Sequence, residues 1–124
     1  MERTPFDLAA TLGAYDTERL TLCSIGSHSA LEVAAGARAH GLRNLIITER
    51  GRNRTYDTVY ARRFDAPPRG CVDATLELAR FADVLDDAVQ ERLRAENVVF
   101  VGNRSFEVYL HQRYAYAEIE ERMR

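Results

Sequence analysis

Two short polar loops in this sequence each follow a glycine and precede a segment with helical character. Residues 26–29 read Gly-Ser-His-Ser, and residues 102–105 read Gly-Asn-Arg-Ser. At the start of a helix, unpaired backbone amides and the helix dipole attract an anion. Arg104, in the second loop, adds a guanidinium whose planar fork suits a phosphate. The two loops together predict a binding site for a phosphorylated ligand.

A second reading of both loops stays open. Serine is a frequent N-cap residue, so Ser27 and Ser105 are equally consistent with helix caps, and Arg104 with an exposed surface residue. The loops are not a dinucleotide fingerprint, because no second or third glycine stands at the required spacing, and NAD is disfavoured. All 17 basic residues are arginine. The absence of lysine excludes a Walker loop, Schiff-base chemistry and a receiver-type phosphoacceptor site.

The remaining titratable residues give weaker signals. His28, in the first loop, is a stronger functional candidate than His40 or His111, and three histidines without short spacing do not predict a metal site. Five arginines between residues 50 and 63 are consistent with binding phosphate or RNA, but an exposed loop that pairs with nearby acids fits the acidic chain better. Cys23 and Cys71 lie far apart and predict free thiols.

The elements around the loops follow from the spacing of apolar residues. A strand, an alanine-rich helix and a second strand form a β-α-β unit, which builds a parallel sheet. The segment over residues 49–73 predicts an irregular connection. The predicted strands cover residues 20–25, 44–48, 75–78 and 98–101, and the predicted helices cover residues 4–13, 28–40, 83–96 and 106–113.

This alternation predicts a doubly wound, Rossmann-like α/β fold: a parallel sheet of about four strands with helices on both faces. In such sheets ligands bind beyond the carboxyl ends of the strands. Both polar loops lie at such ends, and they share one crevice if the first and fourth strands are neighbours. Residues 1–113 are expected to form this domain, and residues 114–124 a charged amphipathic tail.

The composition is typical of a globular protein with one core. The 124 residues are 46% hydrophobic and 29% charged, with a net charge of −2. This balance provides no basic field for nucleic acid. No apolar run approaches the roughly 18 residues of a membrane span, and the N-terminus lacks a signal-peptide pattern. The sequence therefore predicts a cytoplasmic protein that binds neither membrane nor nucleic acid.

Five segments carry a resemblance to a known family: residues 22–31, 35–41, 49–56, 90–93 and 98–106. With them the chain resembles the N-terminal domain of formaminoimidazole-carboxamide ribonucleotide (FAICAR) synthetase over residues 6–119. That family comprises formate-dependent ligases of the ATP-grasp superfamily in archaeal-type purine biosynthesis. The chain departs from the family pattern at Asn103 and Arg104, where the family has His-Gly, and in a longer segment at 66–71.

The resemblance implies a pre-ATP-grasp domain that binds aminoimidazole-carboxamide ribonucleotide and is not catalytic alone, with no cofactor or metal of its own. ATP and magnesium are implied for the full-length ligase. ATP-grasp domains of the same chain or of a partner chain would complete that enzyme, and a homo-oligomer is compatible with this arrangement. The substrate contacts expected from the resemblance and the loops are His28, Ser105, Gly26, Ser27, Ser29 and Arg104.

The departures from the family pattern keep other functions open. One is a ligase with a changed substrate, for example in a methanopterin-type one-carbon cofactor pathway. Others are a standalone module or partner subunit that binds a phosphorylated metabolite, and a structural domain that docks other domains. Because 124 residues leave no space for ATP-binding domains, we expect a fragment or an orphaned domain that does not hydrolyse ATP.

Overall fold

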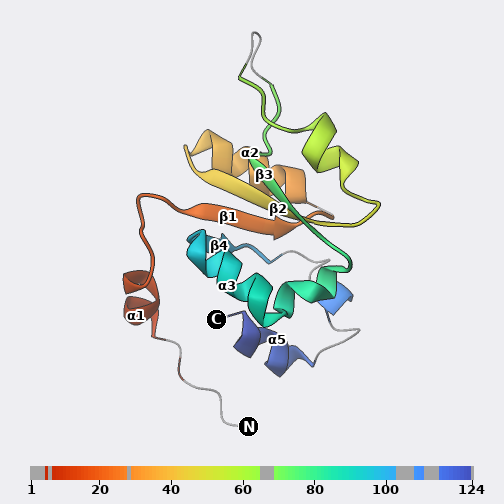
Figure 1. Ribbon diagram of the computed structural model, residues 1–124. Coiled ribbons are helices and arrows are strands. Elements are labelled where there is room, and N and C mark those ends of the chain that lie inside the picture. Colours follow the sequence, from red (N-terminus) through yellow and green to blue (C-terminus); the bar gives the residue numbers. More distant parts are fainter. Residues whose placement is uncertain are drawn as a thin grey trace.

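A four-stranded parallel sheet forms the centre of the computed structural model. Its strands are β1 (Thr21–Ile25), β2 (Arg43–Glu49), β3 (Ala74–Leu78) and β4 (Val98–Phe100), in the order β3-β2-β1-β4 (Figure 1). All three pairings are parallel. The predicted parallel α/β fold is therefore confirmed. The structure describes residues 5, 7–27, 29–64, 69–102, 108–110 and 115–123.

Helices cover both faces of the sheet, as predicted, because successive strand residues point to opposite faces and both sets are apolar. On one face lies α2 (Ala30–Ala39), whose buried alanines allow a close approach to the strands. On the other face lie the 3₁₀ helix η2 (Phe81–Leu85), α3 (Asp87–Ala95) and α5 (Tyr116–Arg122) (Figure 1). The segment expected to be an amphipathic tail contributes Ile119, which is only 4% exposed, to the larger core.

Several element boundaries differ from those predicted. The helix expected over residues 83–96 is divided into η2 and α3, because Asp86 between them is extended, with ψ of 139°. The irregular connection after β2 contains a π-helix, η1 (Thr55–Val59). The first helix, α1 (Leu8–Gly13), begins after Asp7, whose carboxylate accepts a hydrogen bond from the Ala10 N–H at 3.0 Å. Residues 108–110 are helical, and the rest of the helix expected over 106–113 lies outside the described residues.

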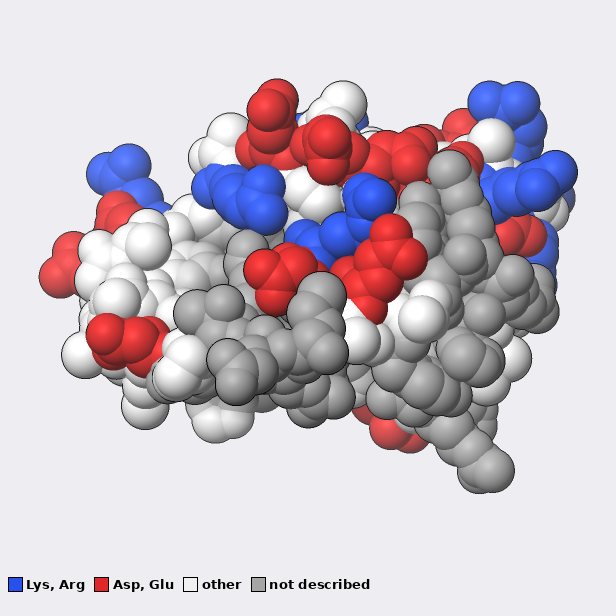
Figure 2. Space-filling view, turned by 90° about the horizontal axis from the view of Figure 1, so that it is seen from below, with Lys and Arg blue, Asp and Glu red and all other residues white. Residues whose placement is uncertain are grey.

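Charged residues of both signs share the face seen from below. Figure 2 shows arginines and acids side by side in that view. In the α3 and α5 helices, Arg122 contacts Glu118 at 3.2 Å and Asp87 at 3.9 Å, and Arg92 contacts Glu96 at 3.8 Å. Exposed pairs of this kind contribute at most about 1 kcal/mol each. These arginines are therefore partnered surface residues.

Candidate functional site

The turn formed by Gly26 and Ser27 ends β1 and packs against the segment that follows β2. The Gly26 N–H donates to the Ile47 carbonyl at 2.7 Å, and the Ser27 N–H donates to the Ile25 carbonyl at 2.8 Å. A Cβ atom at position 26 would lie 2.8 Å from Cε2 of Tyr56 and 2.9 Å from the Ile47 carbonyl oxygen. Such contacts are too short for any side chain, so the packing requires glycine at this position.

The backbone N–H groups of this turn do not provide the anion-binding donors that the sequence suggests. The N–H groups of Gly26 and Ser27 both donate to carbonyls, so neither is available to a ligand in this conformation. The N-cap of α2 is Ser29, which has a left-handed φ of 71° and makes no side-chain capping bond. Ser27 is therefore not the N-cap, and the helix begins at Ala30 rather than at residue 28. Positive charge for an anion must come from elsewhere.

A hollow of about 440 Å³ opens beside the turn, and two arginine side chains at its wall supply positive charge. Arg52 and Arg54 are both exposed at its wall, and within the described ranges neither forms an ion pair. Two guanidinium groups beside a polar turn suit a phosphate monoester, because charge-assisted hydrogen bonds from arginine are strong and directional. The lining residues are Gly26, Ser27, Gly51, Arg52, Arg54, Thr55 and Tyr56.

The arginine-rich segment thus has two parts with different roles. Arg62 pairs with the carboxylate of Asp73 at 3.1 Å, as expected of a loop that pairs with nearby acids. Arg52 and Arg54 instead line the hollow, and the sequence analysis did not include them among the site residues. Their position shortly after the carboxyl end of β2 is the signal that could have found them, because ligands bind at that edge of a parallel sheet.

Tyr109 is a second residue that the sequence analysis missed. Arg52 donates through Nη1 to the Tyr109 hydroxyl at 3.4 Å, and the Tyr109 ring packs on Phe81 with centroids 4.7 Å apart. Hydrogen bonds from Arg52 and from Ser27 lower the pKa of the Tyr109 hydroxyl. Burial, in contrast, raises the pKa of Tyr56, which follows Arg52 in the segment after β2. Tyr109 therefore links Arg52, after β2, to Phe81 in the core.

The six predicted site residues fall into two groups. Gly26 and Ser27 line the hollow, and Ser29 follows them at the start of α2. Three of the predicted residues, His28, Arg104 and Ser105, lie outside the described residues.

The two predicted polar loops can share one crevice only if the first and fourth strands are neighbours, and the sheet order satisfies this condition. β1 and β4 are neighbours, and Thr21 is paired with Val98. Beyond the last strand residue, the Val101 N–H donates to the Cys23 carbonyl at 2.7 Å. The chain that follows β4 therefore leaves the sheet next to β1, at the edge where the hollow lies.

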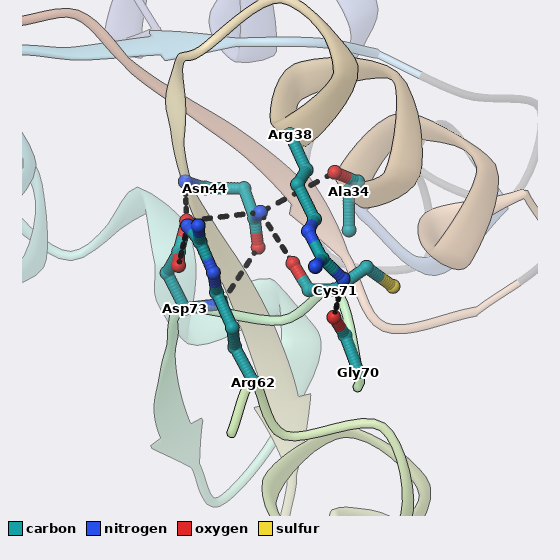
Figure 3. A network of polar contacts seen from close by, with 7 residues as sticks. All are labelled: Ala34, Arg38, Asn44, Arg62, Gly70, Cys71 and Asp73. Carbon is teal, nitrogen blue, oxygen red and sulfur yellow. Dashed lines mark hydrogen bonds and ion pairs between the residues drawn. The ribbon is translucent and has the colours of Figure 1, made fainter. Parts of the chain in front are cut away.

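A polar network at the amino end of β2 holds the connection between η1 and β3 in place (Figure 3). The buried Asn44 side chain donates to the Cys71 carbonyl at 2.7 Å and accepts from the Asp73 N–H at 3.1 Å. The Asp73 carboxylate accepts from the Asn44 N–H at 3.0 Å and from Arg62 at 3.1 Å. Because these groups satisfy one another, the long connection is fixed to the sheet.

Other chemistry can be assessed only for the part of the chain that the structure describes. There, no three histidine, cysteine or carboxylate side chains converge in a way that would hold a metal ion. No helix in the same residues has the length and apolar character needed to cross a membrane. Cys23 and Cys71 are free thiols, as predicted.

The fold and the hollow define a class of protein: a parallel α/β domain with a polar, arginine-lined hollow at the carboxyl ends of its strands. Comparison with protein families matches residues 22–123 to the family described as "Protein of unknown function (DUF1246)". The chain belongs to this family.

Relatives with curated names include proteins of archaea. The chain is 36% identical to a protein of Methanopyrus kandleri over 104 residues, which is 84% of this chain and 26% of that protein. It is 31% identical to a Methanobrevibacter smithii protein and 32% identical to a Korarchaeum cryptofilum protein, each over 103 residues, or 83% of this chain. All three are named 5-formaminoimidazole-4-carboxamide-1-(beta)-D-ribofuranosyl 5'-monophosphate synthetase. The resemblance to FAICAR synthetase over this part of the chain is therefore confirmed. The chain spans 26% of the length of these relatives.

Proposed function

We propose that this chain is the ribonucleotide-binding N-terminal part of an ATP-dependent ligase similar to FAICAR synthetase. The observation that carries the proposal is the juxtaposition of the Gly26–Ser27 turn with Arg52 and Arg54 around one hollow. The relatives are named for a product that carries a ribofuranosyl 5'-monophosphate. A ribonucleotide therefore matches the hollow in charge, because its phosphate would meet two arginines that form no ion pair among the described residues.

In this proposal the hollow binds aminoimidazole-carboxamide ribonucleotide by its phosphate and sugar. The exocyclic amine would then attack the carbonyl carbon of formyl phosphate made from formate and ATP. A C–N bond forms, the C–O bond to phosphate breaks, and the amine loses a proton. The contribution of this domain is to hold the amine in position, which is the orientation component of catalysis. His28, Arg104 and Ser105 belong to the proposed binding surface on the resemblance and loop reading alone.

The rest of the reaction is proposed for the remaining length of the relatives, of which this chain spans 26%. ATP and magnesium would bind to ATP-grasp domains of the same chain or of a partner chain. The proposal also includes a cytoplasmic location, in keeping with purine biosynthesis. A homo-oligomer is compatible with it.

Calorimetric titration of the chain with two ligands tests the phosphate assignment. We expect the ribonucleotide to bind at least about tenfold more tightly than the corresponding ribonucleoside, because only the former offers a phosphate to the arginines. Inorganic phosphate should compete with the ribonucleotide. Equal affinity for the ribonucleotide and the ribonucleoside would contradict the assignment.

A further inference from the structure

We propose that Tyr109 is a positioning residue that holds Arg52 against the ribonucleotide hollow; this inference rests on the proposed function. Tyr109 does not line the hollow itself, and its hydroxyl is the acceptor for the Arg52 Nη1 at 3.4 Å. The guanidinium carbon of Arg52 also lies 6.0 Å from the centroid of the Tyr109 ring, at the outer range of a cation–π contact. Tyr109 therefore acts on a ligand in the hollow through Arg52.

The ring of Tyr109 is itself fixed by the core. It packs on Phe81, which is 1% exposed, with the two ring planes at 52°. The Phe81 N–H in turn donates to the carboxylate of Glu49 at 3.1 Å, and Glu49 is the last residue of β2. The hydroxyl of Tyr109 is thus held at a defined place relative to the sheet. An anchored acceptor of this kind can order a mobile side chain.

Arg52 is the side chain that needs such an anchor. It is exposed, and a free arginine side chain loses rotamer entropy when a ligand fixes it. A hydrogen bond made before the ligand arrives lowers the entropy lost on binding. Arg54, on the same hollow, has no corresponding acceptor among the described residues. The geometry therefore assigns to Arg52 the preorganised contact and to Tyr109 the task of preorganising it.

Arg52 is also the largest cause of the lowered pKa of the Tyr109 hydroxyl, in agreement with the contact of 3.4 Å between the two side chains. The loss of this hydroxyl should release Arg52 without removing the aromatic ring from the core.

A double-mutant cycle tests the inference. Tyr109→Phe keeps the ring and removes the hydroxyl, and Arg52→Gln removes the charge. We expect Tyr109→Phe to weaken ribonucleotide binding about fivefold, the equivalent of one hydrogen bond, and to leave ribonucleoside binding unchanged. In the Arg52→Gln background the same substitution should have no further effect, because the two residues act as one unit.

Two controls separate this inference from the proposed function. Tyr15→Phe makes the same chemical change next to α1, away from the hollow, and should leave the affinity unchanged. In a ¹³C-tyrosine NMR titration, Arg52→Gln should raise the pKa of the Tyr109 hydroxyl toward its ordinary value, which a purely structural ring would not do. If the unmodified chain binds no ribonucleotide, both proposals fail. If it binds but the two losses add, or the ribonucleoside is equally affected, only the role of Tyr109 is overturned.

Discussion

The ring of Tyr56 lies against Gly26 so closely that Cε2 occupies the space a side chain at position 26 would need. The distance from that atom to an ideal Cβ is 2.8 Å. Tyr56 is 8% exposed and lies in the π-helix η1, so the contact joins the end of β1 to the connection after β2. π-helical turns are rare and are often found at functional sites. The packing of Tyr56 in the wall of the hollow thus requires glycine at position 26.

Substitution of this glycine should therefore damage both stability and binding. We expect Gly26→Ala to lower the free energy of unfolding by about 1–3 kcal/mol, because the methyl group overpacks a rigid turn. Gly36→Ala is the matched control. Position 36 lies inside α2 with nothing within 4 Å of an added Cβ, so alanine should raise stability by about 0.5–1 kcal/mol. Urea denaturation measures both, and an equal response at the two positions would refute the close packing at Gly26.

The charges at the hollow should determine affinity for a phosphorylated ligand. Arg52→Gln and Arg54→Gln should each weaken ribonucleotide binding roughly tenfold or more, since a hydrogen bond to a charged group contributes about 1.5–3 kcal/mol. Arg43→Gln is the control, because Arg43 is exposed at the amino end of β2 and does not line this hollow. Isothermal titration calorimetry measures the three constants. A loss for Arg43→Gln as large as the others would indicate nonspecific charge attraction.

The polar network at the amino end of β2 should be important for stability. Asn44→Ala leaves the Cys71 carbonyl and the Asp73 N–H without the partners that Asn44 provides. We expect this substitution to cost about 1–3 kcal/mol, because buried polar groups that lose a partner keep their desolvation penalty. Asn53→Ala, which removes a bond to the exposed Asp57 carboxylate, should change stability by no more than about 0.5 kcal/mol. Thermal unfolding distinguishes the two, and equal melting temperatures would contradict the role of Asn44.

The buried thiol of Cys23 should make stability depend on pH in the alkaline range. Burial, with a smaller contribution from the Glu96 carboxylate, raises the pKa of this thiol from 9.0 to about 12. Below pH 9 the thiol is protonated in both folded and unfolded chains, so its contribution is fully present. Above pH 9 the unfolded chain loses the proton first, and the stability is lost progressively as the pH rises toward about 12.

The effect of Cys23 can be isolated by comparing two variants. Cys23→Ala should reduce the alkaline loss of stability relative to the unmodified chain. Cys71→Ala should reduce it less, because Cys71 is only partly buried, although burial raises its pKa too. Urea denaturation at pH values from 8 to 11 provides the measurement. Identical pH profiles for the two variants would show that Cys23 does not have the raised pKa.

Much of the fold could be predicted from local sequence signals. The apolar runs that became β1 and β2, with an alanine-rich helix between them, identified a parallel unit, and Gly41 ends α2 with a φ of 70°, as its position after that helix predicted. The break at Asp86 could not be predicted, because the apolar stripe runs through it. The buried residues of η2 pack with strand residues in the core, so the position of the break depends on tertiary packing.

The candidate site was harder to predict for a physical reason. The glycine at position 26 marked the end of β1, but its N–H donates to β2 and the Ser27 N–H donates within the turn, and the sequence could not show this. The sequence around Arg52 and Arg54 does not distinguish these two arginines from Arg62. Which of them faces a ligand depends on the path of η1, and the contact of Tyr109 with Arg52 joins residues 57 positions apart.

An amide-resolved NMR titration of the chain with aminoimidazole-carboxamide ribonucleotide is the decisive test of binding at this hollow. We expect shifts at residues 26–29, 51–56 and 109, with little change around Asn44 and Asp73 at the amino ends of the strands. Arg52→Gln should reduce these shifts at a given ligand concentration. Shifts centred on another surface, or none at millimolar ligand, would contradict the assignment of this hollow to the ribonucleotide.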